Sequence, residues 1–384
     1  MQFSKKEVRL GKSMRIGLNL LYLIPNKVGG TETLARELIG GLGRVGKKNE
    51  FYILCNKENY PTFLDTSRIH RVLIPIDAKN KILRLVAEQF LLPFVAQKYK
   101  LDAIHSLGYI TPLICGCYKI VGIHDLNWFY HPEDFGLVER TVLRLLVTLS
   151  AKMSDKIVTL SEASKKSIME VLKIKEDKIE VLYGCAPKLV TPGSRKDLQK
   201  FGIDRKYLFT VLAAYPHKNL IGALKAFKIL VEDKHDILLV VAGLGGRAAE
   251  PISDYIKHAQ LGERVKILGF VENKDLSTLY KFCTIYICPS LYEGFGIPIL
   301  EAFSFGKPVV SSGSFSLKEV VGNAGLLTDA SKPRVFARDI ERVLENKALG
   351  DKISLLGRKR ALIFSSSKMA KEALEIYNKT INEA

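Results

Sequence analysis

The stretch Ser290–Val310, SLYEGFGIPILEAFSFGKPVV, follows a short apolar run, IYICPS at 285–290, that is typical of a buried strand. Pro298 fixes the backbone angle φ at about −65°, which suits the first turn of a helix. The sequence therefore predicts a helix that begins at Pro298 and ends at Gly306. A strand, a glycine-containing turn and a helix in this order indicate one unit of an α/β fold.

Two carboxylates flank this turn, because Glu293 lies ahead of the predicted helix and Glu301 lies in its first turns. Gly294 and Gly296 let the backbone come close to a ligand. The first amides of a helix bind anions, and ionised carboxylates accept hydrogen bonds from hydroxyls. A sugar nucleotide carries both kinds of group. The alternative, that Glu301 only complements the helix dipole, leaves Glu293 unexplained.

The same strand and helix rhythm fills the whole chain. Strands are predicted at 15–23, 51–55, 69–75, 102–106, 118–125 and 155–161, and again at 207–214, 236–243, 265–270, 285–290 and 308–312. Helical periodicity lies between them, and a final helix is predicted at 365–381. The segment 183–204 has two prolines and little periodicity, so it is predicted to be a linker. Two α/β units, each with a parallel sheet, are expected.

Net charge, cysteine spacing and the N-terminal residues limit the ligands and the cellular location that are expected. The 384 residues carry a net charge of +18, which favours phosphorylated ligands, nucleic acid or acidic lipid, although a merely basic soluble protein fits equally well. No zinc-finger spacing or aromatic RNA-binding signature points to nucleic acid. The six cysteines lack metal-binding spacing, and residues 1–13 lack the apolar core of a signal peptide. A cytoplasmic protein with reduced thiols is expected, with association to the inner face of the membrane left open.

The residues 290–312, SLYEGFGIPILEAFSFGKPVVSS, closely resemble the E-x7-E signature of the retaining glycosyltransferases of family four, also called group one. The resemblance extends from Met14 to the last helix. It implies the glycosyltransferase-B fold, an α/β fold with two Rossmann-like domains facing across a cleft. The implied domains are an acceptor-side domain, 1–187, and a nucleotide-sugar-binding domain, 188–364, with the helix 365–384 crossing back to the first domain.

The resemblance also implies donor-binding roles. Glu293 would contact hydroxyls of the donor sugar, and Glu301 would hold the ribose. Further donor contacts are implied for Gly29 and Gly30 in VGGTETL, for Phe270 and Val271 near the nucleobase, and for Gly294, Phe295, Gly296 and Ile297 near the sugar and phosphates. Taken alone, VGGTETL is weak evidence for a ligand site and indicates a plain tight turn, in which Thr31 or Thr33 can help cap the helix.

By the same resemblance, Lys218 in AYPHKNL would pair with the leaving diphosphate. Stabilisation of the negative charge that develops on a leaving phosphate is a large contribution to catalysis. The family often has an arginine five residues earlier, where this chain has Ala213. His217 and Arg247 are candidates to compensate for that departure.

His124 and Asp125 in GIHDLNWFYHPEDF match the His-Asp pair of the family, so His124 is expected to bond the sugar or the acceptor. Asp125, Trp128 and Tyr130 are candidates for an acceptor pocket, with simple loop packing as the alternative. The chain contains no D-x-D motif, which fits an enzyme that needs no metal or other cofactor.

The expected reaction is the retaining transfer of a hexose from a nucleoside diphosphate sugar to a saccharide or lipid-linked acceptor. By the same resemblance, Glu293, His124 and Lys218 would be its catalytic residues, and the implied mechanism is front-side. The sequence shows no well-placed nucleophile for the alternative, a double displacement. The similarity to bacterial mannosyltransferases of surface-polysaccharide synthesis favours GDP-mannose, then a UDP-hexose. A sugar-nucleotide epimerase of the same architecture and a non-catalytic sugar-nucleotide-binding subunit stay open.

The stretch 79–100 mixes basic and large apolar residues. It can lie on an acidic membrane, or it can pack on its own domain as a helix interrupted at Pro93.

Overall fold

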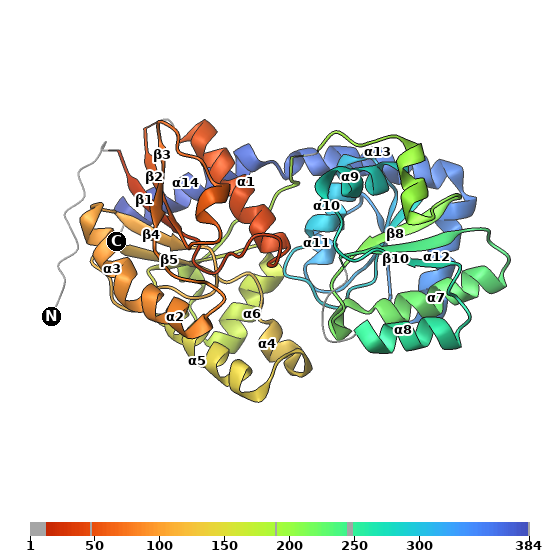
Figure 1. Cartoon of the computed structure of the whole chain (residues 1–384), viewed down its shortest axis with the longest axis horizontal. Coiled ribbons are helices and arrows are strands. Elements are labelled where there is room, and N and C mark those ends of the chain that lie inside the picture. The colour runs from red at the N-terminus through yellow and green to blue at the C-terminus, as the bar shows by residue number, and fades with distance from the viewer. Residues whose placement is uncertain (1–12, 47, 189, 244–248, 383–384) are drawn as a thin grey trace. The chain divides into compact units, whose positions relative to one another are not determined.

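A computed structural model describes residues 13–46, 48–188, 190–243 and 249–382 (Figure 1). The chain divides into two compact units. Unit 1 contains the residues up to Cys185 together with those from Ser365, and unit 2 runs from Ala186 to Phe364. The domain boundary expected from the sequence lay after residue 187.

Unit 1 is built on a parallel sheet, seven-stranded among the described residues, in the order β3-β2-β1-β4-β5-β6-β7. Its strands are β1 Arg15–Asn19, β2 Glu50–Cys55, β3 Ile69–Leu73, β4 Ala103–Ser106, β5 Tyr118–Gly122, β6 Lys156–Thr159 and β7 Ile179–Val181. Its helices are α1 Gly30–Val45, α2 Lys81–Val86, α3 Leu92–Lys98, α4 Asn127–Tyr130, α5 Leu137–Met153, α6 Glu162–Leu172 and α14 Ser366–Asn382, with short turns η1 Tyr60–Thr62, η2 Ala87–Leu91, η3 Pro132–Asp134 and η4 Glu176–Lys178.

Unit 2 has a second parallel sheet, six-stranded in the described part of the chain, in the order β10-β9-β8-β11-β12-β13. Its strands are β8 Tyr207–Val211, β9 Leu238–Ala242, β10 Val265–Ile267, β11 Ile285–Cys288, β12 Val309–Ser312 and β13 Leu326–Thr328. Its helices are α7 Leu220–Glu232, α8 Ala249–His258, α9 Asn273–Phe282, α10 Ile297–Ser304, α11 Leu317–Val321, α12 Pro333–Glu345 and α13 Lys347–Ile363, with short turns η5 Arg195–Phe201 and η6 Pro216–Lys218.

The strand order changes direction at one point in each sheet. In unit 1, β1 pairs in parallel with both β2 and β4, so that Ile16 lies beside Phe51 and Ala103. In unit 2, β8 lies between β9 and β11 in the same way. Ligands of such sheets bind at the carboxyl ends of the strands next to this point. The turns after β1 and β8 are therefore where a site is expected.

Both sheets are covered by helices, which explains why the strands read as continuous apolar runs. All five residues of β9 are buried, and β11 is buried along its whole length. Helices α10 and α13 pack closely at Gly357, where an added Cβ would lie 2.5 Å from the Phe303 ring. The core of unit 2 thus continues through α10, the helix of the opening stretch.

The C-terminal helix α14 belongs to unit 1 and packs against α1. Gly41 makes this approach possible, since an added Cβ would lie 2.4 Å from the carbonyl oxygen of Ser366 and 2.8 Å from Cβ of Ala370. At the inner end, the Tyr377 hydroxyl lies 2.8 Å from Nδ1 of His105 on β4.

Several expectations need correction. The short strands β7 and β13 were not predicted, because three residues carry too little periodicity. The predicted linker 183–204 contains the helical turn η5, which a capping box between Ser194 and Asp197 begins. The helix of the opening stretch begins at Ile297 and ends at Ser304, one to two residues before the predicted limits.

The helix in 79–100 is not interrupted at Pro93. The chain stays helical from α2 to α3 because η2 is a π-helical turn, in which the Leu92 amide bonds to the Ala87 carbonyl. A wider turn removes the clash that a proline ring makes with the carbonyl four residues earlier. No helix among the described residues is both long and apolar enough to cross a bilayer.

Candidate functional site

The turns after β8 and β11 are tied to each other in unit 2. Asn219 has the left-handed angle φ of 55°, and its side-chain amide donates to the carbonyls of Pro289 at 3.1 Å and Ala330 at 2.8 Å. The Leu291 amide donates to the His217 carbonyl at 2.8 Å. These bonds fix the position of Lys218, which lies between His217 and Asn219.

Lys218 and Glu293 form an ion pair at the carboxyl ends of β8 and β11. Nζ of Lys218 lies 2.8 Å from Oε2 of Glu293, and the two side chains are 18% and 21% exposed. Each of them therefore keeps a surface that a ligand can reach. The Glu293 carbonyl accepts a hydrogen bond from the Ser316 hydroxyl, which anchors the loop behind the carboxylate. The structure thus brings together two residues that the sequence singled out separately.

The turn into α10 requires glycine. Gly296 has φ of +108°, an angle that other residues rarely adopt, and an added Cβ would lie 2.8 Å from Cδ2 of Leu317. The helix begins at the next residue, Ile297, so its first amides have no partner inside the helix. These amides form a partial positive charge close to Glu293 in the chain.

Glu301 is held by a buried tyrosine. The Tyr280 hydroxyl donates to Oε2 of Glu301 at 2.6 Å, and Tyr280, a residue of α9, is buried. Burial raises the pKa of the Glu301 carboxyl, and this hydrogen bond opposes the rise. Oε1 has no hydrogen-bond partner among the described residues. Glu301 is therefore an oriented carboxyl group with one oxygen left to accept a hydrogen bond.

The donor-side candidates Phe270 and Val271 of unit 2 follow β10. Phe270 is 67% exposed, whereas Val271 is buried. The Gly243 amide bonds to the Gly269 carbonyl at 2.6 Å, which joins the turns after β9 and β10. Of the groups proposed to compensate for Ala213, His217 is buried and stacks on Tyr215, and Arg247 lies outside the described residues.

In unit 1, the turn after β1 is open. Gly29 has φ of +59°, and apart from Gly29 itself and its two neighbours in the chain, no described atom lies within 4 Å of the place where its Cβ would be. Gly30 is the first residue of α1. The expected threonine cap is absent from this helix start in the described structure, because Thr31 donates its hydroxyl to the Val28 carbonyl. The backbone of Gly29 is thus accessible to a ligand.

His124 is anchored in the fold. It is 8% exposed, and its Nε2 lies 2.9 Å from the Leu107 carbonyl oxygen, so Nε2 carries the proton and donates. Burial lowers the pKa of His124, which keeps the ring neutral. Nδ1 is buried and has no hydrogen-bond partner among the described residues. Nδ1 is therefore the unprotonated ring nitrogen, and as a buried atom it has no surface that a ligand can reach in this structure.

The candidate acceptor residues have different surroundings. Asp125 accepts a hydrogen bond from the Tyr109 hydroxyl at 3.0 Å, and Tyr130 is 38% exposed. Trp128 is 5% exposed and packs in a core cluster with Val147 and Leu172, so loop packing describes its position.

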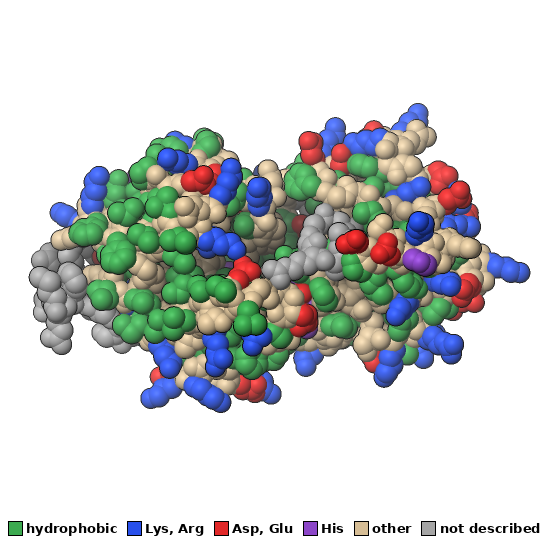
Figure 2. All heavy atoms as spheres, turned by 60° about the horizontal axis from the view of Figure 1, so that its bottom comes forward, with side chains coloured by type: hydrophobic (Ala, Val, Ile, Leu, Met, Phe, Trp, Pro, Cys, Tyr) green, Lys and Arg blue, Asp and Glu red, His purple; other side chains and the backbone are tan. Residues whose placement is uncertain are grey.

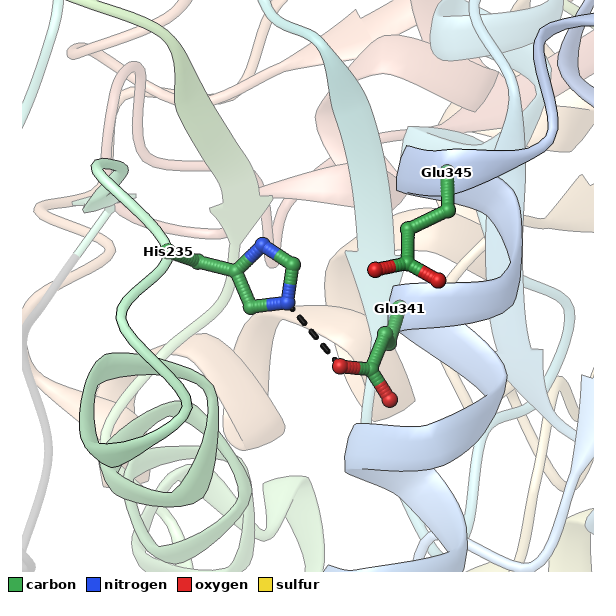
Figure 3. Close-up of side chains that lie close together, drawn as sticks. All are labelled: His235, Glu341 and Glu345. Atoms are coloured by element: carbon green, nitrogen blue, oxygen red, sulfur yellow. Dashed lines mark hydrogen bonds and ion pairs between the residues drawn. The ribbon is translucent and has the colours of Figure 1, made fainter.

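One group of side chains in the described part of the chain has metal-ligand geometry: His235, Glu341 and Glu345, whose ligand atoms lie within 4.8 Å of one another (Figure 3). His235 precedes β9, at the amino end of the sheet, whereas Lys218 and Glu293 follow strands at the carboxyl end. Nε2 of His235 lies 3.0 Å from Oε1 of Glu341. This group joins the turn after α7 to α12 and is not part of the site around Lys218.

Two protein-family models match the chain. One is described as "Glycosyl transferases group 1" and matches residues 194–360, and the other as "Glycosyltransferase Family 4" and matches residues 28–187. Together they cover most of each unit and leave out the C-terminal helix α14.

Individual proteins are similar over most of the chain. An "Uncharacterized glycosyltransferase MJ1607" of Methanocaldococcus jannaschii is 30% identical over 299 residues, 72% of this chain and 75% of that protein. An "O-antigen chain mannosyltransferase B" of Escherichia coli is 29% identical over 269 residues, 67% of this chain and 69% of that protein. The solved structure of a sucrose-phosphate synthase from Thermosynechococcus elongatus has a TM-score of 0.77 at 18% identity and covers 97% of this chain and 100% of that one.

Proposed function

Because this chain belongs to the group 1 glycosyltransferases and has the glycosyltransferase-B fold, we propose that it transfers a hexose from a nucleoside diphosphate sugar to a saccharide or lipid-linked acceptor. The observation that carries the proposal is the pair of Lys218 and Glu293 at the switch point of the unit 2 sheet. One charge suits a diphosphate and the other suits sugar hydroxyls.

The diphosphate binds to Lys218 and to the first amides of α10, beginning at Ile297. Both groups are fixed before the ligand arrives, Lys218 by the bonds around Asn219 and the helix start by Gly296. Preorganised positive charge of this kind stabilises the charge that develops on a leaving phosphate. Glu293 shares Lys218 with the phosphate and accepts a hydrogen bond from the donor sugar.

Glu301 holds the ribose of the nucleotide. Since Tyr280 occupies Oε2, the remaining oxygen accepts a hydrogen bond from a ribose hydroxyl. Phe270, which is exposed after β10, offers an apolar surface for the nucleobase.

The proposed transfer retains the anomeric configuration. The bond between the anomeric carbon and the phosphate oxygen breaks, and the acceptor oxygen bonds to the same face of that carbon. The acceptor hydroxyl gives its proton to the leaving phosphate, and Lys218 stabilises the phosphate charge. No metal ion enters this scheme, in keeping with the lack of a D-x-D motif in the sequence.

The proposed donor is GDP-mannose, with a UDP-hexose as second choice. The similarity to an O-antigen chain mannosyltransferase supports mannose. Calorimetric titration with GDP, UDP and ADP, first in EDTA and then with magnesium, tests the donor. Binding of GDP in EDTA is expected. Binding only of UDP would replace the donor, and binding only with magnesium would contradict metal independence.

The role of the ion pair is tested with Glu293→Gln against the matched control Glu263→Gln, an exposed glutamate of unit 2. The first variant should lose about 100- to 1,000-fold in turnover with unchanged circular dichroism, and the control should keep wild-type turnover. Transfer by Glu293→Gln at the wild-type rate would contradict the proposal.

A second candidate function is a non-catalytic sugar-nucleotide-binding subunit, favoured by Ala213 at the position where the family often has an arginine. Such a protein binds the donor but neither transfers nor hydrolyses it. Conversion of the donor to an epimer without acceptor would instead indicate an epimerase. Product analysis after incubation with GDP-mannose, with and without acceptor, separates the three activities.

A further inference from the structure

One side of unit 1 exposes an unusual number of large apolar side chains. They lie on the helical run α2–η2–α3, on the loop before β5 and on α5. The set is Ile82, Leu83, Val86, Phe90, Leu91, Phe94, Ile114, Leu137, Val138, Val142 and Leu145, with exposed fractions between 41% and 82%. Scattered apolar residues are normal on a protein surface, but a gathered set marks an interaction site. Figure 2 shows hydrophobic side chains gathered on this side of unit 1.

An ion pair and two hydrogen bonds join the three elements into one surface, the apolar face. Nζ of Lys81 on α2 lies 2.7 Å from Oε1 of Glu139 on α5. Gln89 on η2 donates to the Thr111 carbonyl at 3.2 Å and accepts from the Leu113 amide at 3.0 Å, which holds the Ile114 loop beside the helix. The exposed side chains therefore belong to neighbouring elements and not to separate parts of the unit.

The helical run is apolar on two opposite sides. Leu92 and Ala96 face inward and are buried, whereas Val86, Phe90 and Phe94 recur every four residues and are exposed. A helix that serves only to cover its own sheet carries polar residues on its outer side. The outer stripe therefore has a partner that the chain itself does not supply among its described residues.

The charges around the apolar face are almost all positive. Residues 79–100 and 137–152 together hold eight basic side chains and two acidic ones. Of the acidic pair, Glu88 is buried and Glu139 is bonded to Lys81. Arg140 and Arg144 are exposed on α5 between the apolar residues. Long basic side chains lay their stems along apolar surface and reach phosphate groups with their ends.

We propose that the apolar face of unit 1 docks on the surface of a bilayer that contains anionic lipid. Such a surface offers acyl chains for Phe90, Phe94 and Leu137 and headgroup phosphates for the surrounding lysines and arginines. A second copy of the chain would bring the same positive charges together, and the net charge of +18 adds to that repulsion. A bilayer satisfies both the apolar and the charged parts of the face.

The test is sedimentation of the full chain with vesicles of phosphatidylcholine alone or mixed with phosphatidylglycerol. The variant Phe90→Ser/Phe94→Ser removes two side chains that are 64% and 70% exposed. The matched control Leu355→Ser/Leu362→Ser removes two exposed leucines from α13 of unit 2. We expect the control to bind mixed vesicles with the affinity of the wild type. The phenylalanine variant should lose at least about tenfold in affinity for the same vesicles.

Charge is tested with Arg140→Gln/Arg144→Gln, which should weaken binding to mixed vesicles and make it less sensitive to salt. All variants alter exposed positions, so unchanged melting curves are expected and check that each folds. Equal vesicle binding by the phenylalanine variant and the wild type, or no binding by the wild type, would overturn the proposal. So would self-association of the wild type without lipid that the phenylalanine variant abolishes. No sugar nucleotide is present, so the result is independent of the transfer reaction.

Discussion

Replacing Glu88 by glutamine should stabilise unit 1 at alkaline pH. Glu88 lies on the π-helical turn η2, is 2% exposed and has an Oε2 without a hydrogen-bond partner among the described residues. Burial raises the pKa of Glu88 from 4.5 to about 7, while Arg84 and a hydrogen bond to Asn19 oppose the rise. The folded protein therefore carries this carboxylate at a cost whenever the pH is above that value.

The sign and size of the effect follow from proton linkage. Between pH 4.5 and about 7 the folded state binds more protons at Glu88 than the unfolded state, so the free energy of unfolding falls as the pH rises and levels off above pH 7. Glutamine does not titrate. The stability of Glu88→Gln relative to the wild type should therefore increase by about 2–3 kcal/mol between pH 5 and pH 8.

Urea unfolding followed by tryptophan fluorescence measures this difference. Trp128 is the single tryptophan and is buried in unit 1, so the signal reports that unit alone. Glu170→Gln on α6, an exposed position of the same unit, serves as the control and should track the wild type at both pH values. The titrating groups other than Glu88 and Glu170 are common to all three proteins and cancel. A stability difference between Glu88→Gln and the wild type that stays constant from pH 5 to pH 8 would refute the reasoning.

Three further substitutions test unit 2. Asn219→Ala removes two hydrogen bonds and puts alanine at a left-handed φ, so thermal unfolding of unit 2, followed by circular dichroism, should show a loss of about 2–4 kcal/mol; a loss below 0.5 kcal/mol would contradict this. Gly296→Ala should weaken nucleotide binding at least about tenfold in calorimetry, because its Cβ meets Leu317 and displaces the start of α10; unchanged affinity would argue against a ligand at this turn. Tyr280→Phe removes the hydrogen bond to Glu301 and should raise the pKa of that carboxyl further. The pH dependence of nucleotide affinity, measured by calorimetry, should then move to higher pH. A pH dependence equal to that of the wild type would show that this bond does not control the carboxyl.

The sequence predicted the α/β class and most strands because apolar runs such as 236–243 are buried on both faces in a parallel sheet. It could not predict β7, because this strand has only three residues and is defined by its pairing with the neighbouring strand β6. The continuous helix through Pro93 also escaped prediction. A π-helical turn has no sequence pattern of its own, and here Glu88 and Leu92 are buried at it.

At the site, the sequence singled out Lys218, Glu293 and Glu301 from their turns and from a family resemblance, but not the contacts that hold them. The hydrogen bond from Tyr280 to Glu301 joins two helices, and the bond from His124 to Leu107 joins the ends of two strands. Such contacts depend on the register of the whole sheet. A local motif therefore identifies the residue and leaves its partner and its protonation unknown.

The helix α14 completes unit 1 only at the end of the chain, after all of unit 2. A ribosome that adds about 5–20 residues per second needs roughly 10–40 s to pass from Cys185 to Ser365. During that interval the nascent first unit has no partner for the α1 surface at Gly41, and His105 lacks its bond to Tyr377. Unit 2 can finish folding first, even though it is encoded second. An expression plasmid for unit 1 alone must therefore encode the residues up to Cys185, a linker and then residues 366–382.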